Sequence, residues 1–283
     1  MTLDEMTMSL EIGLVYGIVA IGIYITFRII DFPDLTCDGS FVLGAAVSSI
    51  LAKNNYNPWF AIVAALSTGC VAGIATGLLY THLKISNLLS GILVSFMLYS
   101  VNLHIMNGVP NISLNISQTI FSQALAVTIL SAIVVVVCLL IGYLFITDFG
   151  LALYSIGQNK KLAQYNGINI KKMTIIALAL SNGFIALGGA LFSQNQGFAD
   201  IGSGIGTIIV GLASIVIGEK ILQYRNIAVK IISCVIGSVI YRALIGFALH
   251  SNVLGLQTFD LNLITGVLII VVMCIPRRKY VIS

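Results

Sequence analysis

The strongest concentration of reactive side chains is the stretch Asp31-Phe-Pro-Asp-Leu-Thr-Cys-Asp-Gly-Ser40, which holds three carboxylates and a proline between two apolar segments. Pro33 disfavours helical geometry at the residue before it, so the stretch predicts a broken or re-entrant element. Polar groups on broken backbone between apolar segments are typical of a solute pathway. The candidate residues here are Phe32, Asp34, Thr36, Asp38, Gly39 and Ser40.

Asp38 has two interpretations. If Gly39 and Ser40 open the next helix, Asp38 lies near the helix amino terminus, where unpaired N–H groups hold a cap carboxylate or an anionic solute group. Alternatively, the stretch is a solvated turn in which Asp38 is an ordinary cap. The apolar run that follows is too short for a normal span, and the sequence leaves both interpretations open.

A second candidate region contains Phe198, Asp200 and Gly204 in the glycine-rich sequence FADIGSGIG. Its glycines allow a tight turn or a close helix contact. The pattern lacks the Lys-Ser or Lys-Thr of a phosphate-binding loop, and no such loop occurs elsewhere in the chain. Any ATP would therefore be hydrolysed by another polypeptide.

Arg242 lies inside an apolar segment, where a charge is costly and indicates a functional role. Asp200 and Asp260 are possible ion-pair partners for Arg242. Arg242 is therefore also a candidate pathway residue. The alternative is that Arg242 extends to the outer interface with a structural role only.

Enzymatic and metal chemistry find little support in the sequence. The cysteines and histidines show no ligand spacing, so no metal site is predicted. Neither HExxH nor a nucleophile elbow occurs, and no catalytic residue is predicted.

The elements that position these residues must be membrane helices. Hydrophobic residues make up 58% of the chain and charged residues 8%, with a mean hydropathy of +1.05. We predict an all-α integral membrane protein with about nine transmembrane or re-entrant helices, in a range of about eight to ten. The segments lie near residues 10–30, 39–52, 59–80, 87–106, 121–146, 174–194, 203–219, 229–248 and 259–275.

Basic residues set the expected orientation, because short basic loops face the cytoplasm. Lys160, Lys161, Lys171 and Lys172 form one basic group, and Arg277, Arg278 and Lys279 form another. Both groups are predicted to be inside and the acidic amino terminus outside, although Lys53 disagrees. Nucleic-acid binding is not expected, since these charges sit at helix ends.

The chain also matches itself at an offset of 166 positions, which aligns GIVAIG with GFIALG and FPDL with FADI. With the orientation given above, the first copy crosses the membrane from outside to inside and the second from inside to outside. We therefore predict an inverted-topology repeat, with a solute pathway at the interface between the two copies. Small residues recur in any membrane bundle, and an accidental match is the alternative.

A family resemblance emerges in the loop DFGLALYSIGQNKKLAQYNGINIKK, which is mildly amphipathic and suits a short surface helix. With FRIIDFPDLTCDGSFVLGAA, QNQGFADIGSGIGTIIVGLASIVIGE and LITGVLIIVVMCIPRRK, it resembles permease subunits of ABC importers of the branched-chain amino acid and ribose group. The tryptophan/tyrosine-type subgroup is the most similar. The resemblance covers nearly the whole chain and implies an ATPase coupling loop that contains Gly150, Leu151, Gly157, Ala163, Gly167, Ile168 and Asn169.

The resemblance further implies the partners. These are a cytoplasmic ABC ATPase, an external or lipid-anchored substrate-binding protein, and a second permease copy, most simply in a homodimer within membrane lipid. No cofactor is expected on this chain, and ATP and magnesium would bind the ATPase.

One permease domain would occupy residues 1–283, with halves at 10–146 and 174–275 and the coupling loop at 147–173. The expected function is import of a small nutrient, an amino acid by preference, across the bacterial inner membrane by alternating access. The alternative is an ion-coupled secondary transporter that uses Asp34, Asp38, Asp200 or Arg242.

Overall fold

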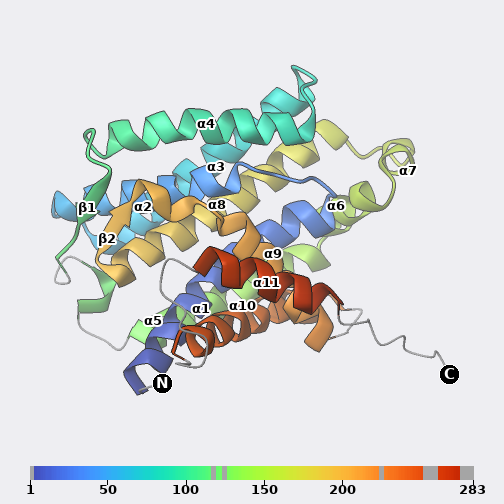
Figure 1. Ribbon diagram of the computed structural model, residues 1–283. Coiled ribbons are helices and arrows are strands. Elements are labelled where there is room, and N and C mark those ends of the chain that lie inside the picture. Colours follow the sequence, from blue (N-terminus) through green and yellow to red (C-terminus); the bar gives the residue numbers. More distant parts are fainter. Residues whose placement is uncertain (1–2, 116–118, 123–125, 223–225, 251–260, 275–283) are drawn as a thin grey trace.

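The fold is a bundle of helices with one small sheet (Figure 1). The structure is a computed structural model that describes residues 3–115, 119–122, 126–222, 226–250 and 261–274. Its first part contains α1 (Leu3–Tyr24), the π-helix η1 (Ile25–Ile29), α2 (Cys37–Lys53), α3 (Pro58–Thr81), α4 (Asn87–Ile105), β1 (Asn111–Ser113), η3 (Ile120–Ser122) and α5 (Ala126–Ile146). The remainder contains α6 (Asp148–Gln158), α7 (Lys160–Tyr165), α8 (Ile170–Gln196), β2 (Phe198–Asp200), η4 (Ile201–Gly204), α9 (Thr207–Ile221), α10 (Ile227–His250) and α11 (Leu261–Cys274).

The long helices coincide with the predicted apolar segments. Among the described residues, 7 helical stretches are long and apolar enough to cross a membrane. The helices α2 and α11 have 17 and 14 residues, and α2 is the short apolar run that follows Asp38 in the sequence. The predicted all-α membrane fold is confirmed, and residues 259, 260 and 275 of the last predicted segment lie outside the described residues.

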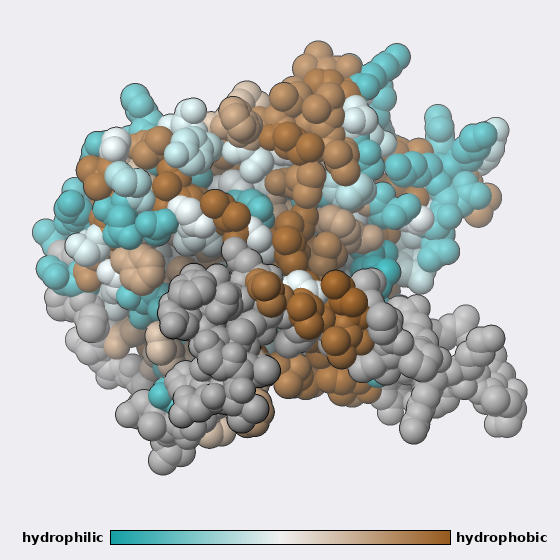
Figure 2. Space-filling model, viewed as in Figure 1, coloured by the Kyte–Doolittle hydropathy of each residue, from teal (hydrophilic) through white to brown (hydrophobic). Residues whose placement is uncertain are grey.

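The face of the molecule drawn in Figure 2 has polar ends and an apolar middle. Figure 2 shows hydrophilic residues gathered near α6 and α7 at one end and near β1 and β2 at the other, with hydrophobic residues across α4 and α11 between them. A band of this kind, crossed by the long helices, suits a bilayer. The first turns of α1 lie toward the end of the bundle that carries the two strands.

Contacts between the two halves follow the repeat. Gly22 of α1 faces Ser181 and Ile185 of α8, while Gly188 of α8 faces Val15 and Val19 of α1. At the offset of 166, residue 15 corresponds to 181, 19 to 185 and 22 to 188, so each contact is the counterpart of the other. The numbers rise along α1 as they fall along α8, and the two helices are therefore antiparallel.

The same correspondence holds for whole helices, with α1 matching α8, α2 matching α9 and α3 matching α10. Helix α1 packs on α10, and its counterpart α8 packs on α3. Likewise, α2 packs on α3, and its counterpart α9 packs on α10. The two central helices, α1 and α8, are buried along most of their length. The α3–α8 contact is close because Gly69, Gly73 and Gly77 lie against α8.

The small sheet closes one end of the bundle. Strands β1 and β2 are antiparallel, with Asn111 opposite Asp200, Ile112 opposite Ala199 and Ser113 opposite Phe198. The sheet thereby joins the segment that follows α4 to the segment between α8 and α9.

Candidate solute pathway and coupling loop

Each half contains a helix break that begins with the same local turn. In the first break, Asp34 Oδ1 accepts the backbone N–H of Thr36 at 2.9 Å. In the second, Asp200 Oδ1 accepts the backbone N–H of Gly202 at 2.7 Å. The side chain of Cys37 donates to the carbonyl oxygen of Asp34, and the side chain of Ser203 donates to that of Asp200. The two turns therefore share a second hydrogen bond, made by the residue three positions after the aspartate. A side chain that bonds to the backbone two residues on replaces the helical pattern locally.

The first break enters the protein interior. Asp34 is fully buried, and its Oδ2 accepts Asn182 Nδ2 at 2.7 Å. Asn182 lies near the middle of α8, and its Oδ1 accepts the hydroxyl of Ser40 at 2.7 Å. The hydroxyls of Thr36 and Thr76 are 2.7 Å apart. These contacts satisfy a carboxylate that would otherwise be costly to bury.

Asp38 joins the two halves. It lies in the first turn of α2, but its carboxylate accepts N–H groups at the start of α9, from Gly206 at 3.3 Å and from Ile208 at 3.0 Å. Gly206, which precedes α9, has no side chain to cap that helix. Asp38 is therefore a helix cap, as both interpretations of the sequence allow. The helix that it caps is α9 of the other half, however, and not the helix α2 in which it lies.

Two cavities meet beside Asp38. The smaller, about 100 Å³, lies between α2, α4 and η4 and is lined by Asp38, Gly39, Val42, Ser95, Tyr99, Asn102, Ile201, Gly204 and Ile205. The larger is an open hollow of about 500 Å³ along α4, lined by Leu35, Asp38, Ile92, Ser95, Phe96 and Tyr99. The described residues of the two linings include one carboxylate and no basic side chain. Mostly apolar walls with a few polar groups are typical of small-solute sites.

The predicted pathway residues divide into groups. Asp38, Gly39 and Gly204 line the smaller cavity, whereas Asp34, Thr36 and Ser40 belong to the buried network behind it. Phe32 is buried, with its ring centroid 5.0 Å from that of Tyr80.

The remaining predicted residues lie outside the cavity linings. Phe198 is partly exposed on β2, and Asp200 Oδ2 accepts Asn111 Nδ2 at 2.9 Å. Arg242 forms no ion pair with Asp200, and its guanidinium lies 4.6 Å from the centre of the Tyr16 ring. Its other possible partner, Asp260, lies outside the described residues.

The predicted coupling loop folds into two short helices, α6 and α7, where the sequence suggests one. Gly150 lies against Phe145 where α5 turns into α6, and the side chain of Leu151 is exposed. Gly157, in the last turn of α6, packs directly on the carbonyl group of Ile29 in η1. The loop therefore contacts the backbone of the first break without an intervening side chain.

Gly167 terminates α7 with a φ of +80°. The N–H of Ile168 bonds to the carbonyl of Ala163, and the N–H of Gly167 bonds to that of Gln164, which is the Schellman pattern. Ala163 is buried, and Asn169 caps α8 by accepting the N–H of Lys172 at 3.2 Å. Gly167 thus ends α7, and Asn169 caps the start of α8.

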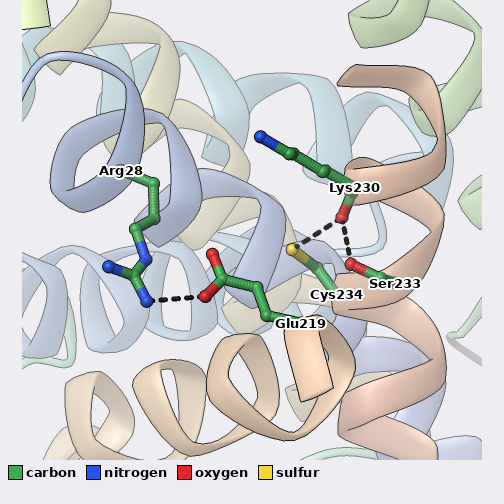
Figure 3. Close-up of polar contacts among 5 residues, drawn as sticks. All are labelled: Arg28, Glu219, Lys230, Ser233 and Cys234. Atoms are coloured by element: carbon green, nitrogen blue, oxygen red, sulfur yellow. Dashed lines mark hydrogen bonds and ion pairs between the residues drawn. The ribbon is translucent and has the colours of Figure 1, made fainter. Parts of the chain in front are cut away.

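An ion pair links the first break to the second half near this loop. Arg28 in η1 and Glu219 near the end of α9 are 2.6 Å apart. Figure 3 draws this pair as sticks. In the same view, Ser233 and Cys234 donate to the carbonyl of Lys230 within α10. Arg28 is 44% exposed, so water screens the pair.

The sequence interpretation missed Asn182, Asn102 and the Arg28–Glu219 pair. Both asparagines lie inside apolar segments, and that position was an available signal of a polar role. The ion pair had no signal, because its residues are 191 positions apart.

A bundle of apolar helices, in which two helix breaks meet at a small cavity, is typical of a membrane transport protein. Comparison with known proteins gives the particular family. Residues 6–273 match the family described as branched-chain amino acid transport system / permease component. The chain belongs to this permease family.

Relatives agree with this assignment. The chain is 41% identical to the tyrosine transport system permease protein of Clostridioides difficile, over 91% of this chain and 86% of the relative. It is 23% identical to the ribose import permease protein RbsC of Escherichia coli, over 98% and 87%. It is also 29% identical to the inner membrane ABC transporter permease protein YjfF of Escherichia coli, over 73% and 65%. No solved structure matches the chain.

The chain is thus a multi-pass permease subunit of an ABC-type importer, as the sequence resemblance implies. That family works with an ATPase and a substrate-binding protein. The comparisons give no support to the ion-coupled alternative.

Proposed function

We propose that this permease moves an amino acid inward across the bacterial cytoplasmic membrane by alternating access. The solute would pass the cavities beside Asp38, between α4 and the two helix breaks. Movement of an ATPase would reach these breaks through α6 and α7. ATP and magnesium would bind that ATPase, and this chain would hold no cofactor of its own.

The observation that carries the proposal is the meeting of the two breaks at Asp38. One carboxylate holds the starts of α2 and α9 together, so any relative movement of the halves must change the cavity between them. Transporters with inverted repeats commonly bind solute where short broken helices meet. Differential contacts in two states are what allow ATP binding to shift such an equilibrium.

The proposed coupling route is short. Gly157 touches η1, and η1 leads through Asp31 and Pro33 to Asp34 at the start of the buried network. The Arg28–Glu219 pair adds a second link, from η1 to α9. A displacement of α6 would therefore be transmitted to both breaks.

The remaining assignments follow from the family and from charge. An amino acid is favoured as the solute because the relative named for tyrosine transport is more similar to the chain than the relative named for ribose import. Two copies of the chain would pair within membrane lipid, with an external or lipid-anchored binding protein on one side. The basic α6–α7 region would be cytoplasmic and the amino terminus outside.

The test is affinity purification of the tagged full chain in mild detergent, with identification of copurifying subunits and an assay of ATP hydrolysis. A stoichiometric ATPase, whose activity rises when amino-acid-loaded binding protein is added, is the expected result. A pure chain that transports solute without any ATPase would overturn the proposal and favour an ion-coupled mechanism.

A further inference from the structure

The Asp38 carboxylate, which borders both cavities, only accepts hydrogen bonds. Each of its oxygens takes one backbone N–H at the start of α9, from Gly206 and Ile208, and a carboxylate has acceptor capacity for more. The other polar side chains of the two linings belong to Ser95, Tyr99 and Asn102, whose hydroxyl and amide groups can both donate and accept. Among the described residues, no lysine, arginine or histidine lines either cavity to bind an anionic group.

Asn102 supplies the second observation. Its side chain is 1% exposed and lines the smaller cavity. The amide Nδ2 donates to the carbonyl of Gly39 at 3.2 Å, whereas Oδ1 has no hydrogen-bond partner. A flipped amide would place Oδ1 against the Gly39 carbonyl oxygen, and two acceptors repel each other, so this contact fixes the orientation of the amide. A buried acceptor without a partner costs free energy unless a ligand or a movement satisfies it.

The two acceptors are linked through the backbone. Asp38 and Gly39 are consecutive, and Asn102 is bonded to Gly39, so the Asp38 carboxylate and the Asn102 side chain line one small cavity. An ammonium group has three donors and no acceptor, and it matches these two acceptors. A sugar hydroxyl carries an acceptor as well, which neither of these two oxygens can satisfy.

We propose that Asp38 and Asn102 select a primary ammonium group on the passing solute. Leu35, Ile92 and Phe96 wall the larger hollow, so the rest of the solute is apolar or aromatic. The ring of Tyr99, which borders both cavities, can also face a cation. This inference rests on the proposed function and assigns the solute group that the pathway recognises.

The experiment uses protection of an engineered cysteine. Ser95, which borders both cavities, is replaced in Ser95→Cys, and the full chain in lipid nanodiscs is labelled with a maleimide. The unsubstituted chain gives the background from native cysteines. The probes are phenylalanine, phenethylamine, 3-phenylpropionate and ribose.

Phenylalanine and phenethylamine are expected to slow labelling at concentrations at least about tenfold below those of 3-phenylpropionate and ribose, because a charge-assisted hydrogen bond is lost without the amine. Equal protection by probes with and without the amine would overturn the inference. Absence of protection by every probe would overturn it as well.

Two variants in the same background assign the residues. Asp38→Asn and Asn102→Leu should raise the half-protective concentration of phenethylamine about tenfold and about fivefold. Asp31→Asn is the matched control: it removes the same charge from an exposed position that lines neither cavity, and asparagine tolerates the positive φ found there. Unchanged labelling rates without ligand and unchanged melting temperatures identify folded variants.

If Asn102→Leu fails to fold, Asp38→Asn still decides the outcome. Unchanged protection in folded Asp38→Asn would overturn the role of the carboxylate. The ATPase assay separates this result from the proposed function. A copurifying, stimulated ATPase without amine-dependent protection would refute the inference alone.

Discussion

Gly157→Ala should uncouple ATP hydrolysis from transport. A Cβ atom at this position would overlap the carbonyl oxygen of Ile29, since α6 lies directly on the backbone of η1. A carbon–oxygen contact needs about 3.3 Å, so α6 and η1 must separate by roughly 1.5 Å. Forcing extra volume into packed structure costs about 1–3 kcal/mol.

That cost falls on the contact through which the ATPase would move the first break. Purified complexes in proteoliposomes would be assayed for ATP hydrolysis and for solute accumulated per ATP consumed. We expect the solute accumulated per ATP to fall about tenfold, which corresponds to about 1.4 kcal/mol. The ATPase should still copurify, because the exposed surface of α6 and α7 is unaltered.

Gly142→Ala provides the control. Gly142 lies in α5, and a Cβ atom there would meet no other atom within 4 Å. Both variants replace a helical glycine with alanine, so they share the gain in helix propensity. If Gly157→Ala couples hydrolysis to transport as well as Gly142→Ala does, the proposed route from α6 to η1 is wrong.

Three further predictions follow from contacts of the site. Gly167→Val should lower transport-coupled ATP hydrolysis while the chain still folds, because a backbone φ of +80° favours glycine over a β-branched residue. Gly167→Asn should have a milder effect in the same assay, because asparagine adopts positive φ more readily. Asp34→Ala should lower the melting temperature of the detergent-solubilised chain, by the equivalent of about 2–4 kcal/mol, since Asn182 loses a buried partner; an unchanged melting curve would contradict this. Glu219→Gln should change stability by about 1 kcal/mol or less, given the exposure of Arg28, and a large loss in thermal unfolding would show that the pair is not screened.

Hydropathy alone predicted most of the fold, because a bilayer requires apolar runs of a given length and the short runs of α2 and α11 stand out against it. The local turns were also predictable. The Phe-x-Asp element aligned at one offset, and its two aspartates make the same bond to the backbone two residues on.

Contacts between the halves could not be predicted in the same way. Asp38 caps α9, 168 positions away, and this depends on how deeply α2 enters the bundle rather than on any local pattern. Similarly, Asn182 and Asn102 acquire their roles only when α8 and α4 pack beside α2. The sequence therefore identified the broken elements and left open which groups they would meet.

The paired turns at Asp34 and Asp200 depend little on their surroundings. Each is held by one side chain and its own backbone, so the same turn can form in two very different environments. Asp34 is buried and bonds to Asn182 of α8, whereas Asp200 belongs to β2 and pairs with Asn111 of β1. One local motif therefore breaks a helix inside the protein in one half and starts a strand contact in the other.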